Sequence, residues 1–261
     1  LIRGENLDNI LNESEKTVNY LNDDKNTASQ YLPGLQLIST LKDYNGKITL
    51  YKDSFNENFL KIFNPKQDLE AIFYYYFCRS ICSVYFNDYQ NSLKLFENSE
   101  NILLLIAKTR LFPEHYFFYS LAITAVFEKF SSKEKKHYRK ILSRNQNNLK
   151  NWINNYSSAE LNSKANTNSY FHKYLLIEAE IAKINNNKNA AEIFEKALRL
   201  ASQHEIINDI ALISELTAKF YLSENKELIA KAYMTEAHKS YLKWGAVGKA
   251  QNLEDNYSKL I

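Results

Sequence analysis

The sequence predicts an all-α fold, a right-handed solenoid of antiparallel helical hairpins with about 11 or 12 helices. The 261 residues include only 5 glycines and 3 prolines, and no glycine lies between Gly46 and Gly245. This scarcity disfavours tight strand hairpins and glycine-rich loops over most of the chain. Apolar residues also recur at three- and four-residue spacings through most of the sequence, as they do on the buried faces of helices.

The first predicted segment, residues 1–64, is a less regular helical region. Helical spacing of apolar residues covers residues 7–21 and 31–41. The pair Pro33-Gly34 marks either an early helix turn or an interruption. Residues 47–54 alternate weakly between apolar and polar and form either a loop or a short extended piece.

The second predicted segment, residues 65–156, consists of helical hairpins. Residues 69–86 are apolar on most sides of a helix, which indicates burial between neighbours, and residues 89–108 form the partner helix. Pro113 opens another helix, since the missing N–H of proline is harmless in a first turn. Ser131-Ser132 can cap the following helix, in which a break at Asn145 is an open alternative. The polar residues 157–169 predict an exposed connection.

The third predicted segment, residues 169–261, contains an internal repeat with an offset of 40 residues. Small residues at two positions let paired helices approach closely, and a large residue between them fills the groove. Repetition of this length predicts that each hairpin stacks on the next, so that the three segments form one continuous array. The matched positions are Ala190, Phe194 and Ala197 in the first copy and Ala230, Met234 and Ala237 in the second.

The segment WGAVGKAQ looks like the end of a phosphate-binding loop, but it does not fit one. Such a loop needs Gly-x4-Gly-Lys-Ser/Thr, whereas Gly245 and Gly248 are three positions apart and Ala250 stands at the hydroxyl position. We expect Trp244 to anchor a turn between two helices and Gly245 to cap the first of them with a positive φ. Lys249 is expected to be solvated.

No catalytic, cofactor-binding or metal-binding residue is predicted, and the chain itself is expected not to be an enzyme. Cys78 and Cys82 lie one helical turn apart, but a structural metal site needs about four ligands, so both are interpreted as small buried apolar residues. The five histidines are all more than 20 residues apart. Of these, His172 is a candidate for a hydrogen bond between helices.

The run from Lys133 to Arg144 is the strongest basic patch of the sequence. The chain has 33 basic and 30 acidic residues and a net charge of +3, so no global field marks it as a nucleic-acid binder. A charged run usually forms a solvated helix face, and binding to RNA or to an acidic partner is the alternative interpretation. The candidate binding residues are Lys133, Lys136, Arg139 and Lys140.

The Ala-x3-Phe-x2-Ala spacing resembles the second helix of a tetratricopeptide repeat (TPR). That repeat is about 34 residues long, so the longer offset here predicts a longer connection around residues 204–208. More widely, blocks from residue 69 onward resemble the TPR-like helical region of large bacterial multidomain signalling kinases; they include YFHKYLLIEAEIAKI and LISELTAKFYLSENKELIAKAYMTEAHKSYLKWGA. In that family, a serine/threonine-kinase-like domain and a STAND/AAA-type ATPase domain precede the array, and a GAF domain with a histidine kinase often follows.

The resemblance implies a non-catalytic sensing and scaffolding arm that binds a protein, a peptide or a small ligand and couples to adjacent ATPase and kinase domains. Flanking domains of the same parent chain are expected partners, with a small-molecule effector as an alternative. An independent protein–protein interaction module and a nucleic-acid-binding helical repeat remain the alternative functions. No apolar run approaches the roughly 20 residues of a membrane span, and two cysteines suit a reducing compartment, so a cytoplasmic location is expected. The start at Leu1 suggests a fragment of a longer protein.

Overall fold

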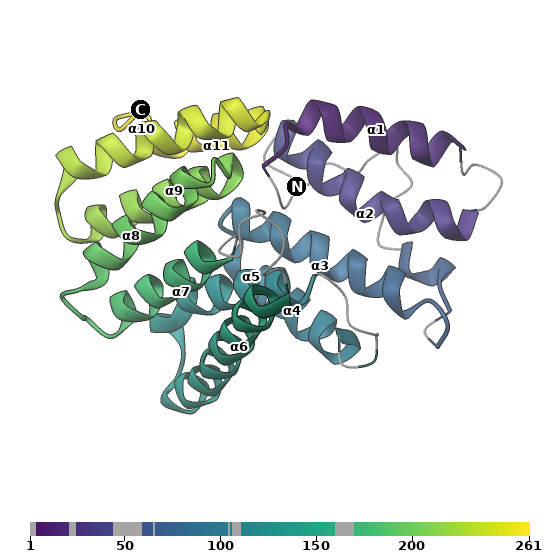
Figure 1. Cartoon of the computed structure of the whole chain (residues 1–261), viewed down its shortest axis with the longest axis horizontal. Coiled ribbons are helices and arrows are strands. Elements are labelled where there is room, and N and C mark those ends of the chain that lie inside the picture. The colour runs from purple at the N-terminus through teal and green to yellow at the C-terminus, as the bar shows by residue number, and fades with distance from the viewer. Residues whose placement is uncertain are drawn as a thin grey trace. The chain divides into compact units, whose positions relative to one another are not determined.

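The structure, a computed structural model, describes residues 4–20, 25–43, 59–64, 66–103, 105, 111–159 and 170–261. Within these ranges every regular element is helical, which confirms the all-α class (Figure 1). The predictions for residues 47–54 and for most of the polar connection lie outside the described ranges. The chain divides into two compact units, of which unit 1 is residues 1–109, 238–259 and 261, and unit 2 is residues 110–237 and 260. The predicted continuous solenoid of all helices stays a prediction.

Unit 1 begins with the packed pair α1 (Leu7–Tyr20) and α2 (Lys25–Lys42). Helix α1 confirms the prediction for residues 7–21. Helix α2 begins before residue 31, because Pro33 lies inside the helix instead of at its start. Leu7 and Leu41 are fully buried and contribute to the core of the unit. A short 3-10 helix, Phe59–Ile62, follows in the sequence.

The central pair of unit 1 is α3 (Leu69–Tyr85) and α4 (Tyr89–Leu103). Helix α3 packs against both α2 and α4. Its buried residues go most of the way round its axis, which is the pattern expected of a helix enclosed by neighbours. The prediction for residues 69–86 is therefore confirmed.

The last helices of the chain complete unit 1. Residues 238–244 of α10 (Glu227–Trp244) and the whole of α11 (Val247–Tyr257) belong to it. Helix α11 packs against α2, and the Asn6 side-chain amide donates a hydrogen bond to the Lys243 carbonyl at 3.3 Å. The two ends of the sequence therefore stabilise each other within one unit.

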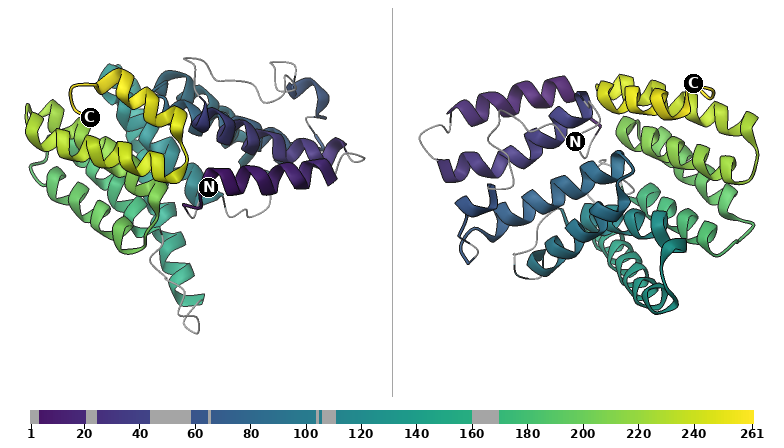
Figure 2. Two further views of the ribbon diagram at one scale, coloured as in Figure 1. Left: turned by 90° about the horizontal axis from the view of Figure 1, so that it is seen from above. Right: turned by 180° about the vertical axis from the view of Figure 1, so that it is seen from behind.

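Unit 2 is built from α5 (Phe112–Val126), a 3-10 turn (Phe127–Lys129), α6 (Ser132–Ala159), α7 (Phe171–Ile184), α8 (Ala190–Gln203), α9 (Ile207–Ser223) and the first part of α10. Helix α5 packs against α6 and α7, α7 packs on α8, and α8 packs on α9 (Figure 2). Helix α6 runs without a break through Asn145. That residue is fully buried, and its amide donates to the Ser120 hydroxyl at 3.3 Å, so it continues the helix instead of ending it.

The six repeat positions are all buried, with exposed fractions of 1% or less. Phe194 of α8 meets Phe220 of α9 with ring centroids 5.2 Å apart, so the large residue of the first copy fills the space between paired helices. Ala190 and Ala197 flank it on the same face. The packing role predicted for these positions agrees with their burial.

Five helix ends share one turn geometry. In each, a residue with positive φ follows the helix, and the next N–H donates to the carbonyl five residues earlier. This is the Schellman motif, which satisfies carbonyls left open at a helix end. The connection between α8 and α9 is one of these short turns, so the prediction of a longer connection there is wrong. Three of the six extra residues lie in α9, with 17 residues against 14 in α7. The other three lie in α10, because Ala230 is the fourth residue of that helix whereas Ala190 is the first residue of α8. The positive-φ residues are Asn87, Asn186, Glu205, Asn225 and Gly245.

Candidate functional site

Helix α6 presents one apolar face to the interior of unit 2 and one polar face to solvent. The apolar face includes the buried residues Tyr138, Ile141, Leu142 and Leu149, at helical spacing. The ring of Tyr138 stacks on that of Phe130 with centroids 4.3 Å apart. This packing fixes the rotation of α6 about its own axis and holds its basic face toward solvent.

A capping box starts the basic helix. The Ser131 hydroxyl donates to the Glu134 carboxylate at 2.6 Å, the Ser131 N–H donates to it at 2.8 Å, and the Glu134 N–H donates back to the Ser131 hydroxyl at 3.4 Å. The hydrogen bonds from the Ser131 side chain and backbone lower the pKa of Glu134. The predicted start at Ser131-Ser132 is confirmed, and it sets the register of the basic residues that follow.

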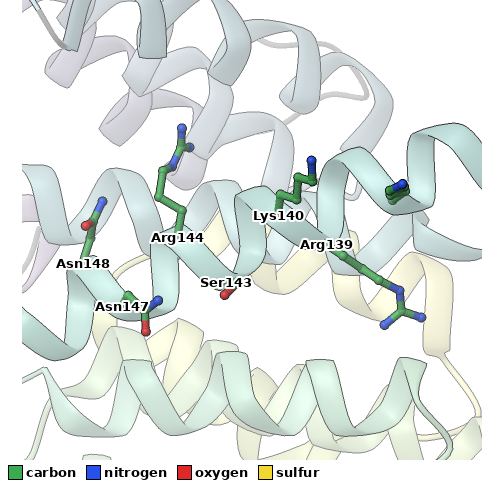
Figure 3. A pocket seen from close by; sticks show the side chains of 7 residues that line it. Arg139, Lys140, Ser143, Arg144, Asn147 and Asn148 are labelled. Atoms are coloured by element: carbon green, nitrogen blue, oxygen red, sulfur yellow. The ribbon is translucent and has the colours of Figure 1, made fainter.

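Two neighbouring rows of side chains on α6 line a hollow of about 720 Å³ (Figure 3). Within a row the residues are four positions apart, so their side chains lie one above the other. Lys140 and Arg144 point to one side of the helix and Arg139 to the other. One row is mainly cationic and the other mainly neutral. The first consists of Lys136, Lys140, Arg144 and Asn148, and the second of Arg139, Ser143 and Asn147.

Arg139 is held in place by its surroundings. Its Nη1 donates to the Asn185 amide oxygen at 2.9 Å, and its guanidinium lies 4.9 Å from the centre of the Phe127 ring. One hydrogen bond uses only part of the five-donor fork of an arginine. Arg139 can therefore donate to an anion without first losing much side-chain freedom.

Three of the four predicted binding residues, Lys136, Arg139 and Lys140, line the hollow. Lys133 is exposed at the start of α6 and does not line it. Arg144, the last residue of the basic run, lines it but was not among the candidates. The neutral lining residues lack the charge on which the prediction relied, although the four-residue spacing continues through them. These are Ser143, Asn147 and Asn148.

The cationic row does not stabilise α6. Lys136, Lys140 and Arg144 follow one another at four-residue spacing, and like charges at this spacing cost an isolated helix about 0.2–0.5 kcal/mol per pair. The described residues place no carboxylate within ion-pair distance of Lys136 or Lys140. Lys136 and Lys140 therefore carry charge that no carboxylate of the described residues pairs.

A second polar cluster is buried between α5, α7 and α9. The Lys173 ammonium lies 2.6 Å from the Glu114 carboxylate and 3.4 Å from that of Asp209. His172 Nε2 lies 2.7 Å from the same Asp209 oxygen, and the Asn208 amide donates to the other oxygen at 3.0 Å. All five side chains are nearly inaccessible to solvent. The hydrogen bond predicted for His172 between helices is thus confirmed.

Burial and the neighbouring charges have opposite effects on the pKa of each ionisable group in this cluster, and which effect prevails differs from group to group. Burial opposes ionisation of Lys173, but Asp209 and Glu114 outweigh it and raise the lysine pKa. Burial also acts to raise the pKa of Asp209, but Lys173 and His172 together outweigh it and lower that pKa. At Glu114, burial together with the negative charge of Asp209 outweighs Lys173 and His172, so the pKa of Glu114 is raised. The cluster is a paired ionic contact that links three helices.

The two cysteines are free and buried, as expected. Burial, with a smaller effect of Cys82, raises the pKa of the Cys78 thiol to about 12, and burial raises that of Cys82 to about 12. A thiol in this state is a poor nucleophile and a poor metal ligand. Among the described residues, no three His, Cys, Asp or Glu side chains are grouped so that they could hold a metal ion.

The segment WGAVGKAQ forms a helix turn. Gly245 has a φ of 90°, as predicted for a cap, and Trp244 is 1% exposed and packs on Tyr85 with ring centroids 5.8 Å apart. The expectation for Lys249 is wrong, since it is fully buried. Its ammonium lies 5.4 Å from the Tyr241 ring centre and 5.9 Å from that of Phe86, so the aromatic faces replace solvent around the charge.

In the described part of the chain, no helix is both long enough and apolar enough to cross a membrane. No family model matches the sequence, and no solved structure matches it. A stretch of 62 residues is 39% identical to hybrid signal transduction histidine kinase G of Dictyostelium discoideum. That stretch covers 24% of this chain and 2% of the kinase, so the likeness is to a small part of a much longer signalling protein.

Proposed function

We propose that this chain is a non-catalytic helical arm of a multidomain signal-transduction protein. The observation that carries the proposal is the 62-residue likeness to a hybrid signal transduction histidine kinase. The all-helical architecture supports it, because helical hairpins provide long surfaces for partners. The repeat positions buried in α8 and α10 support a TPR-like arrangement of the hairpins. The parent protein is proposed to contain the kinase and ATPase domains, while the arm itself carries no chemistry.

In this proposal the arm binds a protein, a peptide or a small ligand and transmits its presence to adjacent domains. Binding can shift the parent protein between two states only if the ligand has different affinities for them. A differential affinity of about 1–3 kcal/mol is typical of such coupling. The partners therefore include at least one flanking domain of the parent protein, whose contact with the arm differs between the states.

The test is a pull-down of the 261-residue chain against the separately expressed flanking domains of its parent protein, with ATP or ADP on the ATPase domain. Binding that differs between the two nucleotides is the expected result. Circular dichroism of the isolated chain checks that it is folded. Absence of binding in both nucleotide states by the folded chain would contradict an internal regulatory arm and favour an independent interaction module.

A further inference from the structure

The first turns of three helices meet at the buried polar cluster of unit 2. Glu114 is the third residue of α5, Lys173 the third residue of α7, and Asp209 the third residue of α9. Helix α7 packs against both α5 and α9. The Lys173 ammonium lies between the two carboxylates, 2.6 Å from that of Glu114 and 3.4 Å from that of Asp209. One cation therefore serves two anions that belong to different helices.

His172 does not supply a second cation to the cluster. Its Nε2 lies 2.7 Å from the Asp209 carboxylate, and a carboxylate only accepts hydrogen bonds, so Nε2 carries a proton. The other ring nitrogen, Nδ1, is buried and has no hydrogen-bond partner among the described residues. A charged imidazole would place a buried N–H at Nδ1 without an acceptor, which is costly. The geometry therefore favours the neutral ring, with its proton on Nε2.

With a neutral His172, the cluster holds one cation and up to two anions. A net charge in a buried site is costly, and one additional proton removes it. Asp209 accepts hydrogen bonds from His172 and from the Asn208 amide, in addition to its contact with Lys173. Glu114 accepts from Lys173. The carboxylate with more donors stays ionised more easily, so Glu114 is the group that takes the proton.

We propose that this cluster is a pH-sensitive switch, in which proton uptake by Glu114 releases Lys173 from α5 and leaves it bound to Asp209 of α9. When Glu114 is ionised, its ion pair with Lys173 links α7 to α5, as the structure shows. When Glu114 is neutral, Asp209 is the remaining anion and attracts the ammonium more strongly. The switch goes beyond the proposed function, because it needs no partner protein and responds to protons alone.

The titration of the two carboxyl groups has the order that the switch requires. Burial, together with the negative charge of Asp209, raises the pKa of Glu114 against the effect of Lys173. The pKa of Asp209 is lowered, since Lys173 and the hydrogen bond from His172 outweigh burial. As the pH falls, the folded cluster therefore protonates Glu114 first. Because its pKa is above the ordinary value of 4.5, neutral Glu114 stabilises the fold, and this stabilisation is lost as the pH rises from 4.5 through the folded pKa.

Other titratable groups lie on the elements around α5 and α7, but the switch does not depend on them. In the described part of the chain, the charges that shift the pKa of Glu114 are those of Lys173, Asp209 and His172. Tyr170 acts on Lys173 instead, whose ammonium lies 5.5 Å from the centre of its ring. The remaining groups are His115 on α5, Glu128 and Lys129 in the 3-10 turn, Tyr138 on α6, Glu178, Glu180 and Lys183 on α7, and Glu215 and Lys219 on α9.

Urea unfolding of the full chain between pH 4.5 and about 8 tests the energetics of the switch. The variant Glu114→Gln keeps the size of the side chain and is neutral at every pH. Relative to this variant, the unfolding equilibrium constant of the wild type should rise by up to about tenfold per pH unit until Glu114 is ionised in the fold. Groups present in both proteins largely cancel in the comparison. The matched control, Glu192→Gln at an exposed position of α8, should keep a constant ratio to the wild type.

NMR of the wild type follows the ammonium directly, so the test remains valid if Glu114→Gln is poorly folded. We expect the ¹⁵N resonance of the Lys173 ammonium to move with pH in the wild type. In a folded Glu114→Gln variant it should stay near its low-pH position. The ¹⁵N shifts of His172 should show an unprotonated Nδ1 over the pH range in which the Lys173 resonance moves.

Three results would overturn the proposal. The first is a ratio of unfolding constants between the wild type and Glu114→Gln that does not change with pH. The second is a Lys173 resonance that stays fixed in the wild type. The third is a movement of Lys173 that accompanies protonation of His172 Nδ1, which would assign the proton to the histidine. Failure of the pull-down with flanking domains would contradict the proposed function and leave the switch in place.

Discussion

Glu205 occupies a backbone position that usually takes glycine. Its φ of 53° is in the left-handed region, which costs an L-residue about 1–2 kcal/mol. Glycine there removes that cost. The greater freedom of a glycine in the unfolded chain, however, lowers the free energy of unfolding by about 0.5–1 kcal/mol. We therefore expect Glu205→Gly to raise the free energy of unfolding by about 0.5–1 kcal/mol in urea denaturation followed by circular dichroism. Lys196→Gly, at an exposed position in the interior of α8, should instead lower the free energy of unfolding by about 1 kcal/mol. If both glycine variants are less stable than the wild type, the strain argument for Glu205 is contradicted.

The five helix-end turns differ in how well the residue with positive φ could be recognised from the sequence. The cap at Gly245 was predictable because glycine is the usual residue at such a position. The equivalent turns at Asn87, Asn186 and Asn225 carry a residue that also tolerates a positive φ but is common throughout this sequence. The remaining turn carries Glu205, and a glutamate gives no local signal of a positive φ. Those helix ends were therefore located only from the loss of apolar periodicity.

Lys173 holds two buried carboxylates in one place. Replacing it with methionine keeps a similar length but leaves Glu114 and Asp209 buried without their cation. Breaking a buried ion pair in this way costs about 3–5 kcal/mol. We expect Lys173→Met to lower the free energy of unfolding by about this amount at pH 7, while Lys188→Met, at an exposed position, should change it by less than about 0.5 kcal/mol.

The loss caused by Lys173→Met should shrink as the pH falls. Without the lysine, burial would raise the pKa of both carboxyls, so they would be neutral in the folded variant at a higher pH than in the wild type. In the wild type, by contrast, the pKa of Asp209 is lowered in the fold. Ionised Asp209 therefore stabilises the fold at pH values above its ordinary pKa of 3.8, and this stabilisation is lost as the pH falls through the folded pKa. A difference between the proteins that is the same at pH 7 and at about pH 5 would contradict this account.

The start of α6 depends on one serine of a pair. Ser131 exchanges hydrogen bonds with Glu134, whereas Ser132 is exposed at the first helical position. We expect Ser131→Ala to lower the free energy of unfolding by about 1 kcal/mol, the usual cost of losing an N-cap. Ser132→Ala is the matched control and should be close to neutral. Hydrogen exchange of the first turn of α6 would show the same contrast, and equal effects of both substitutions would show that the cap does not act through Ser131.

Helices were predictable where the apolar pattern is long and continuous, as in α3 and α5. Two alternatives that the sequence left open, an interruption at Pro33 and a break at Asn145, are wrong because packing outweighs the local rule at both positions. Pro33 is normally a helix-end signal, yet α2 continues on both sides of it. Asn145 is a poor helix former, but it is buried and hydrogen-bonded to α5, so α6 continues through it. The basic residues of α6 were identified because their charges are adjacent in the sequence, which requires no knowledge of the fold.

At the scale of the whole chain, contacts between distant residues were not predictable from spacing. Glu114, Lys173 and Asp209 lie on three helices, and each appears in the sequence as an isolated charge within an apolar stretch. Lys249 was expected in solvent because its immediate neighbours fit a helix surface, whereas its ammonium lies against the rings of Tyr241 and Phe86. The pairing of Asn6 with Lys243 likewise follows from the assembly of unit 1. A sequence without aligned relatives contains no signal for such pairs.

The whole chain should lose stability in alkaline solution, because its buried groups keep their protons longer when folded than when unfolded. The thiols of Cys78 and Cys82 have a pKa of about 12 in the fold against an ordinary value of 9.0. The unfolded chain therefore binds fewer protons from about pH 9 upward, and stability falls by up to about 1.4 kcal/mol per pH unit for each thiol. The raised pKa of Lys173 adds a further loss of stability above its ordinary pKa of 10.5.

Urea unfolding of the reduced protein between about pH 8 and 10.5 should show this fall of stability with pH. The double variant Cys78→Ala, Cys82→Ala should reduce the slope by about 2–3 kcal/mol per pH unit. An unchanged slope in that variant would show that the thiols are not what makes the fold sensitive to base.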